Sequence, residues 1–282
     1  MRIAISADST CDLSAELKKQ HNITTMPIIV TLDEQEYEDG VSITTEQLYE
    51  YIEKTGNLAK TAARSVYEYQ EMFENLLKSC DHVIHFSLSF KISATGSNAL
   101  RASQEIGTDK VTVIDTMSLS SGSGLLILSG AEKINAGKSL EEIKTEIIEE
   151  RERIQASFLV DTLKYLHKGG RCSSIALLGA NLLKIKPRIS LVDGEMKVTK
   201  KYMGNINSSL VKYTKDILEE CPPCLDRVFV TSSSPMDIKE SLVQTLKDYG
   251  FKEVITAEAG STICTHCGKN TLGVLYIKKA SI

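Results

Sequence analysis

The sequence predicts an α/β protein of two domains, an N-terminal domain with a mostly parallel sheet and a C-terminal domain with an antiparallel or mixed sheet. Short apolar runs alternate with amphipathic stretches in the first half, as strands and crossover helices do in parallel sheets. In the second half, Asp193-Gly194 separates two apolar runs and predicts an antiparallel hairpin. The 282 residues, 42% hydrophobic and 25% charged, suffice for two cores.

The first expected domain spans residues 1–155. Apolar runs bounded by turn residues predict its strands, and apolar side chains three and four residues apart predict its helices. Asp12 stands directly before the first helix, where its side chain would cap the free amides. The expected strands are 3–6, 26–32, 81–86 and 110–115, and the expected helices are 13–20, 66–79, 94–106, 122–136 and 139–154.

The second expected domain spans residues 156–282. The hairpin cannot be a parallel crossover, so this half carries antiparallel pairing as well as helices. The expected strands are 156–160, 188–192, 196–200, 227–231, 253–257 and 271–277, and the expected helices are 161–167, 176–183, 207–220 and 237–249.

Charge and targeting signals narrow the classes of function. The net charge is -4 with a pI near 5.8, which gives no bulk attraction to nucleic acid. The amino terminus lacks a secretory pattern, and the uncharged stretch 116–131 is too polar and short for a membrane span. We therefore expect a cytoplasmic protein with no nucleic-acid partner and at most transient membrane contact. The lack of a G-x-x-x-x-G-K-[S/T] loop disfavours a nucleotide kinase.

Polar loops follow several expected strands, at residues 8–10, 87–96 and 115–124. Ligands of open parallel sheets bind beyond the carboxyl ends of the strands, so these loops form the candidate site. Ser93 precedes an expected helix, and its hydroxyl beside the first-turn amides would make an anion site without a cationic side chain. A purely structural role as the N-cap of that helix remains the alternative.

Cysteine pairs suggest a possible metal site. Two pairs have the Cys-x-x-Cys spacing of zinc ligands, which leaves open a zinc-binding regulatory module. The odd total of seven cysteines does not suggest a disulfide framework. The pairs are Cys221 with Cys224 and Cys264 with Cys267.

A single histidine, His266, lies in a polar segment before the last strand. Residues 262–268 are expected to form a loop, in which the imidazole is a hydrogen-bonding partner for an anion. Paired with Ser93 as nucleophile, the same histidine leaves open a serine-dependent acyl hydrolase. No complete G-x-S-x-G nucleophile motif supports that alternative.

Five motifs, found in order along nearly the whole chain, resemble those of the DegV family. The resemblance implies an α/β protein of two domains that buries one long-chain fatty acid between them. It implies no cofactor, no metal and no catalytic activity, and it implies a fatty-acid kinase as the partner that phosphorylates the presented carboxylate. The motifs are I-S-A-D-S-T-C-D-L at 5–13, I-S-A-T at 92–95, D-T-L-K-Y-L-H-K-G-G-R at 161–171, Lys186-Pro187 before the hairpin, and T-H-C-G at 265–268.

The resemblance also assigns the residues around the fatty-acid carboxylate. Thr61 corresponds to the threonine of the family's Thr-Ser-x-Pro-Ser loop, Ser93 to the serine of its Leu-Ser-Gly-Thr loop, and His266 to the histidine of its Thr-His-x-Gly-Pro-Gly loop. Ala94 and Thr95 complete the expected carboxylate-binding set. The chain departs from the pattern because residues 61–65 read T-A-A-R-S, without the second hydroxyl, and residues 268–270 read G-K-N.

A fatty-acid tail would supply most of the affinity, because each buried methylene contributes about 0.8 kcal/mol. Uncharged donors would hold the carboxylate and leave its oxygen free to react. The residues expected to line the tail are Ile28, Leu88, Phe90, Ile92, Leu125, Phe158, Leu163, Leu166, Ile175, Leu178 and Ile189. The residues expected to face a kinase are Lys168, Arg171, Lys200 and Lys201.

Overall fold

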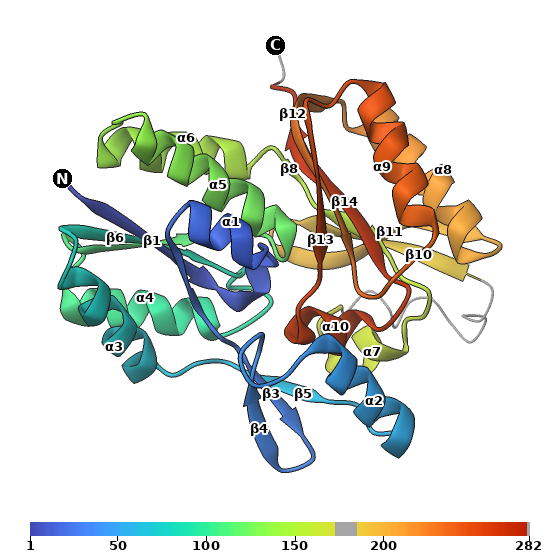
Figure 1. Cartoon of the computed structure of the whole chain (residues 1–282), viewed down its shortest axis with the longest axis horizontal. Helices are drawn as coiled ribbons and strands as arrows, with labels where there is room; N and C mark the ends of the chain where they lie inside the picture. Colours follow the sequence, from blue (N-terminus) through green and yellow to red (C-terminus); the bar gives the residue numbers. More distant parts are fainter. Residues whose placement is uncertain (173–184, 281–282) are drawn as a thin grey trace.

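The first sheet is four-stranded and wholly parallel. The computed structural model describes residues 1–172 and 185–280, and its N-terminal half is built on strands in the order β2-β1-β6-β7 (Figure 1). Buried side chains along β1 and β6 place this sheet between two layers of helices. The strands are β1 (Ile3–Asp8), β2 (Ile23–Met26), β6 (His82–Ser87) and β7 (Val111–Asp115).

The second sheet is mixed and has the order β11-β10-β9-β14-β12-β13, with β8 paired to β14. Among the strand pairs of residues 1–172 and 185–280 in this sheet, β12 and β13 run parallel and the others are antiparallel. Asp193 and Gly194, with φ of 52° and 78°, form the predicted two-residue turn between β10 and β11. The strands are β8 (Ile154–Gln155), β9 (Ser157–Leu159), β10 (Ile185–Val192), β11 (Glu195–Met203), β12 (Pro223–Ser232), β13 (Glu253–Glu258) and β14 (Leu272–Lys278). The predicted fold class is therefore confirmed.

A small antiparallel sheet projects from the first half of the chain and corrects the sequence prediction there. The single strand expected at 26–32 is wrong, because β2 ends at Met26 and Pro27, which has no amide hydrogen to donate, separates it from a strand of another sheet. No element is predicted from the sequence for residues 33–65. The structure forms there, in the order β4-β3-β5, a sheet from β3 (Ile29–Leu32), β4 (Gln35–Glu38) and β5 (Lys60–Ala62), together with α2 (Thr45–Thr55).

Helices cover both faces of the parallel sheet, as Figure 1 shows. The helices α3 (Val66–Leu77) and α4 (Thr95–Ile106) pack on one face, and α5 (Ser121–Asn135) and α6 (Leu140–Arg151) pack on the other. The first helix, α1 (Ala15–Gln20), is capped by Ser14 and not by Asp12 as expected.

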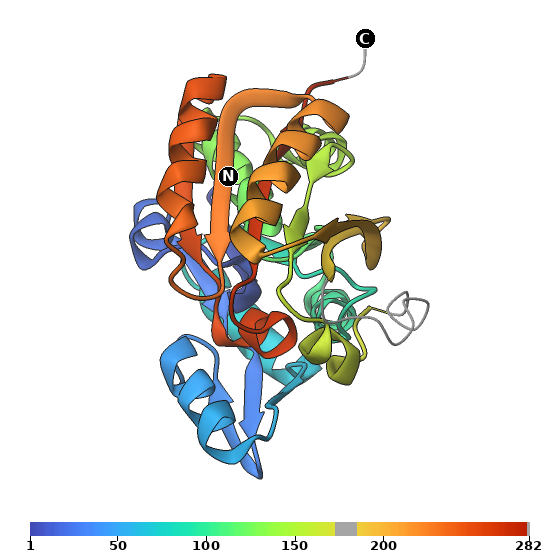
Figure 2. The same cartoon turned by 90° about the vertical axis from the view of Figure 1, so that its right-hand side faces the viewer.

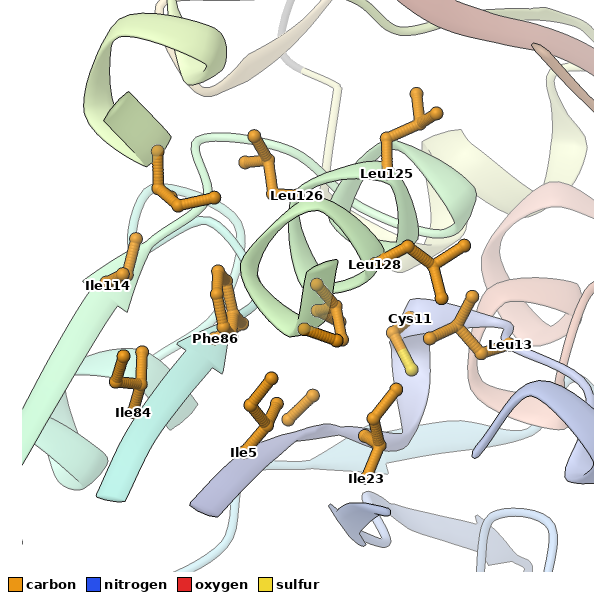
Figure 3. Packing of buried hydrophobic residues seen from close by; sticks show 14 of the residues in the cluster. Ile5, Cys11, Leu13, Ile23, Ile84, Phe86, Ile114, Leu125, Leu126 and Leu128 are labelled. Carbon is orange, nitrogen blue, oxygen red and sulfur yellow. The ribbon is translucent and has the colours of Figure 1, made fainter. Parts of the chain in front are cut away.

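The largest apolar cluster surrounds α5 and joins the two halves of the chain. Figure 3 shows Leu125, Leu126 and Leu128 of α5 above Ile5 and Phe86 of the parallel sheet. The same cluster includes Phe229 and Leu275 of the mixed sheet. The two expected domains therefore pack against each other through this cluster, and the boundary at residue 155 stays a prediction.

The outer face of the mixed sheet carries α8 (Ile206–Glu220) and α9 (Ile238–Tyr249), which lie side by side in Figure 2. Two short helices, α7 (Lys164–Gly169) and α10 (Ser261–Cys267), pack together near the small sheet. Residues 262–268 are thus mainly helical, and the expected loop is wrong. The helix expected at 176–183 lies outside the described residues. Within the described ranges, no helix is both long and apolar enough to cross a bilayer.

Candidate functional site

Two polar residues far apart in sequence meet where the small sheet touches α10. Thr61 lies on β5, paired with Val30 of β3, and His266 lies in the last turn of α10. The Thr61 hydroxyl and His266 Nε2 are hydrogen-bonded at 2.9 Å. This contact, between residues 205 positions apart, joins the small sheet to the C-terminal half of the chain.

The imidazole of His266 is held in its neutral form. Burial, with the charge of Arg171 nearby, lowers its pKa from 6.5 to about 4. Its Nδ1 is buried and hydrogen-bonds to no side chain or backbone group of the described residues. Gly169 packs against the ring so closely that a Cβ at that position would lie 2.4 Å from Nδ1. A glycine at 169 is therefore required by the position of the ring.

Ser93 lies one residue before Ala94, which is the N-cap of α4 and makes no side-chain capping bond, so the expected role of Ser93 as the N-cap is wrong. Its hydroxyl accepts a hydrogen bond from the amide of Thr95, the first residue of α4, at 3.2 Å. Ser93 also lines a cavity with Thr61 and His266. The Ser93 hydroxyl is thus available to a ligand in that cavity.

The side chains of Ala94 and Thr95 do not reach that cavity. Ala94 is exposed, and the buried hydroxyl of Thr95 is hydrogen-bonded to the Tyr69 hydroxyl at 2.9 Å. Tyr69 in turn donates to Asp8, which also accepts from the Leu88 amide at 2.8 Å. Thr95 therefore belongs to the support behind the loop, not to the expected carboxylate-binding surface.

Three neighbouring hollows, which share lining residues, lie around these residues. The inner cavity, of about 50 Å³, is lined mainly by apolar side chains, with Ser93 among its polar residues. The outer groove, of about 580 Å³, opens on the other side of Thr61 and His266, which line both spaces together with Arg171. The deep cavity, of about 30 Å³, shares three lining residues with the inner cavity: Leu119, Ile263 and Cys267. The polar pair thus divides an open groove from an apolar interior.

Four of the expected tail-lining residues line these cavities. The inner cavity is lined by Ile28, Leu88 and Ile92, and the deep cavity is lined by Phe158. Leu163, Leu166 and Ile189 belong to the apolar cluster around them but not to their walls.

Two further expected tail-lining residues lie elsewhere. Leu125 lies in the core around α5, and the Phe90 ring packs on Gly96, where a Cβ would lie 2.1 Å from it. Ile175 and Leu178 lie outside the described residues.

Several lining residues were not predicted from the sequence. Ile263 and Cys267 lie four residues apart on one side of α10, beside the turn that carries His266. Apolar residues four positions apart indicate one face of a helix, which the loop expected at 262–268 does not take into account. The other unpredicted residues on the inner cavity are Thr10, Ala62, Ala63, Leu119, Met196 and Thr262.

The basic residues expected to face a partner fall into two groups. Lys168 and Arg171 are exposed and line the outer groove, and Arg171 reaches the inner cavity as well. A cation therefore borders the polar pair, which differs from the expectation of uncharged groups alone. Lys200 forms ion pairs with Asp216 at 2.6 Å and Glu220 at 2.9 Å, and Lys201 is exposed on β11.

The geometry does not assemble the hydrolase alternative. His266 Nε2 is hydrogen-bonded to Thr61, and no hydrogen bond between His266 and Ser93 occurs among the described residues. No described carboxylate accepts a hydrogen bond from His266 Nδ1, as the third member of a triad would.

The geometry also separates the two cysteine pairs. Cys221 and Cys224 lie at the amino end of β12, whereas Cys264 and Cys267 lie in α10, beyond the carboxyl end of the parallel strand β13. A ten-residue strand such as β12 spans about 33 Å, and zinc–sulfur bonds are about 2.3 Å long. A single four-cysteine zinc site is therefore wrong, and the described residues contain no cluster of three or more metal-ligating side chains.

Fold and site together define a class: an α/β protein of two main sheets with an apolar interior closed by a hydrogen-bonded threonine and histidine. A family profile described as "Uncharacterised protein, DegV family" matches residues 2–279. The chain belongs to the DegV family.

Relatives and solved structures of this family are similar to this chain over nearly its full length. A DegV domain-containing protein of Caldanaerobacter subterraneus is 30% identical and covers 99% of this chain and 99% of its own. A DegV family protein from Thermus thermophilus, described by its fatty-acid binding, has 27% identity and a TM-score of 0.90 over 99% of this chain and 100% of its own. DegV of Bacillus subtilis, described as a fatty-acid-binding protein, has 28% identity and a TM-score of 0.88 over the same shares.

Proposed function

We propose that this protein binds one long-chain fatty acid, with the carboxylate at Thr61, Ser93 and His266 and the hydrocarbon tail in the apolar interior. The observation that carries the proposal is the 2.9 Å contact of Thr61 with His266 at the boundary between an open groove and an apolar cavity that Ser93 also lines. An amphiphile with one polar end fits such a boundary.

The polar end would be held by hydrogen bonds, with one cation at the edge. A buried carboxylate without partners costs several kcal/mol, which the hydroxyls and the imidazole offset. His266 Nδ1 has no hydrogen-bond partner among the described residues, which leaves the imidazole free to adopt the tautomer that donates from Nε2 toward an acidic head group. Arg171 would add an attraction for the negative charge from the outer-groove side.

The tail would extend from the inner cavity past Leu119, Ile263 and Cys267 into the deep cavity. The inner cavity measures only about 50 Å³ and the deep cavity about 30 Å³, which is room for a few water molecules. A tail of about fifteen carbons therefore requires the apolar cluster around Leu88, Leu119 and Phe158 to open. The burial of that tail contributes on the order of 10 kcal/mol before ordering costs.

We further propose that the protein presents its ligand to a fatty-acid kinase and performs no catalysis itself. In that step a carboxylate oxygen attacks the terminal phosphate of ATP, and acyl-phosphate and ADP form. The open groove on the far side of Thr61 and His266 supports such access, and Lys168 and Arg171 lie exposed along it. A reaction with purified kinase and ATP is expected to yield acyl-phosphate only when both proteins are present.

The binding proposal is tested by mass spectrometry of organic extracts of the purified protein and by titration with palmitate and oleate. We expect about one fatty acid per chain, and an affinity reduced about tenfold or more in Thr61→Ala and His266→Ala. His167→Ala, which removes an exposed histidine of α7, is the matched control and is expected to bind normally. Recovery of no fatty acid together with no uptake of either acid would contradict the proposal.

A further inference from the structure

Arg64 stands out because it is a nearly buried cation close to the site that neither the carboxylate nor the tail would touch. Its exposed fraction is 8%, and it follows β5, three residues after Thr61. In the loop pattern that residues 61–65 resemble, the fourth position is proline. Proline restrains a backbone by fixing φ, which an arginine cannot do.

The side chain of Arg64 instead fastens the loop to three neighbouring segments. Its Nη2 donates to Glu38 of β4 and its Nη1 to Glu68 of α3, each at 2.6 Å. Its Nε donates to the carbonyl of Pro27, between β2 and β3, at 2.5 Å. Both carboxylates are thus bound by one planar group, a geometry that suits guanidinium and not ammonium.

The backbone of Arg64 is held as well. Its carbonyl accepts a hydrogen bond from the Asn98 side chain of α4 at 2.7 Å. Glu68 also accepts from the amide and the hydroxyl of Ser65, each at 2.7 Å, in the capping box of α3. The segment between Thr61 and α3 is therefore fixed at both the side chain and the main chain.

We propose that Arg64 is a positioning residue that holds the Thr61 loop against His266 and thereby sets the geometry of the carboxylate site. This inference rests on the proposed function for its ligand, but its geometric part concerns the Thr61–His266 contact alone. Ala62 and Ala63, between Thr61 and Arg64, line the inner cavity, so a displaced loop would alter both the polar pair and the wall beside it.

A matched control exists elsewhere in the fold. Arg227 of β12 also bridges two carboxylates, Glu253 at 2.5 Å and Glu132 at 2.6 Å, but it lines neither the inner cavity nor the outer groove. Loss of Arg64 and loss of Arg227 should both lower thermal stability. Only loss of Arg64 should change the site.

The test compares Arg64→Ala, Arg64→Lys and Arg227→Ala in palmitate affinity and in the NMR titration of His266. We expect Arg64→Ala to bind palmitate about tenfold more weakly and to move the His266 pKa upward toward its ordinary value. Arg64→Lys should recover part of both, and Arg227→Ala should leave both unchanged. Unchanged affinity and titration in folded Arg64→Ala would overturn the proposal.

Two outcomes keep the test decisive. If Arg64→Ala does not fold, Glu38→Gln, which removes one of the two ion pairs of Arg64, is tested in its place. It should weaken palmitate binding and raise the His266 pKa in the same directions, but by less. If the wild-type protein takes up no palmitate, the proposed binding function is wrong. The His266 titration still tests the positioning role of Arg64, because it compares the His266 pKa with and without Arg64 and needs no ligand.

Discussion

Replacement of Gly169 by alanine tests the site without removing any polar group from it. The added Cβ would lie 2.4 Å from His266 Nδ1 and 3.1 Å from the neighbouring ring carbon Cε1. Comfortable contacts between such atoms are about 3.5 Å or longer, so the ring or α7 must shift by roughly 1 Å. A shift of that size would break the 2.9 Å hydrogen bond between His266 and Thr61.

The expected loss follows from that displacement. Overpacking costs about 1–3 kcal/mol of folding stability, and a lost hydrogen bond to a charged ligand weakens binding by about tenfold or more. The assay is palmitate titration together with thermal unfolding. Gly170→Ala is the control: its φ of 66° strains an alanine, but no atom of the residues that the structure describes lies within 4 Å of the added Cβ. Equal affinity in Gly169→Ala and Gly170→Ala would refute the reasoning.

Three further predictions concern ionisation and hydroxyl groups. Burial raises the pKa of Asp12 to about 7, so the folded state retains a proton that the unfolded state has lost, and folding stability falls by on the order of 4 kcal/mol as pH rises from about 4 to 7. Asp12→Asn should remove this dependence of stability on pH in denaturant titrations. An unchanged pH dependence would refute the prediction. The lowered pKa of His266 has the opposite effect on folding stability: its contribution is complete above pH 6.5 and falls as pH decreases toward 4. The loss is at most about 3 kcal/mol and is reduced by solvent screening. His266→Gln should abolish this pH dependence. Ser93→Ala should weaken palmitate binding with little loss of stability, because Ser93 is not the N-cap of α4. Ser14→Ala, which removes the cap of α1, should instead lower stability by about 1 kcal/mol and leave binding unchanged.

The regular elements of the sheets were predictable because their sequence patterns are local. The alternation of strands and helices, and the Asp193-Gly194 turn, required only neighbouring residues. The capping box of Thr44 and Gln47 would have indicated α2. The break at Pro27 depends instead on which sheet each strand joins, which is a tertiary choice.

The candidate site was predictable mainly through family resemblance. Spacing alone cannot bring Thr61 to His266, and Thr, Cys and His have low helix propensity, so α10 is stabilised chiefly by its packing. Asp12 illustrates the same limit. It stands where a cap is expected, but the structure turns it inward, where it accepts from the Gly260 amide at 2.9 Å and the Ser120 hydroxyl at 2.5 Å.

The most direct test of fatty-acid binding at this site is NMR of palmitate isotope-labelled at its carboxyl carbon and bound to the protein. The account predicts one bound carboxyl resonance, shifted from that of free palmitate and changed again in Thr61→Ala and His266→Ala but not in Lys201→Ala. A bound resonance that neither Thr61→Ala nor His266→Ala changes, or no bound resonance at all, would contradict it.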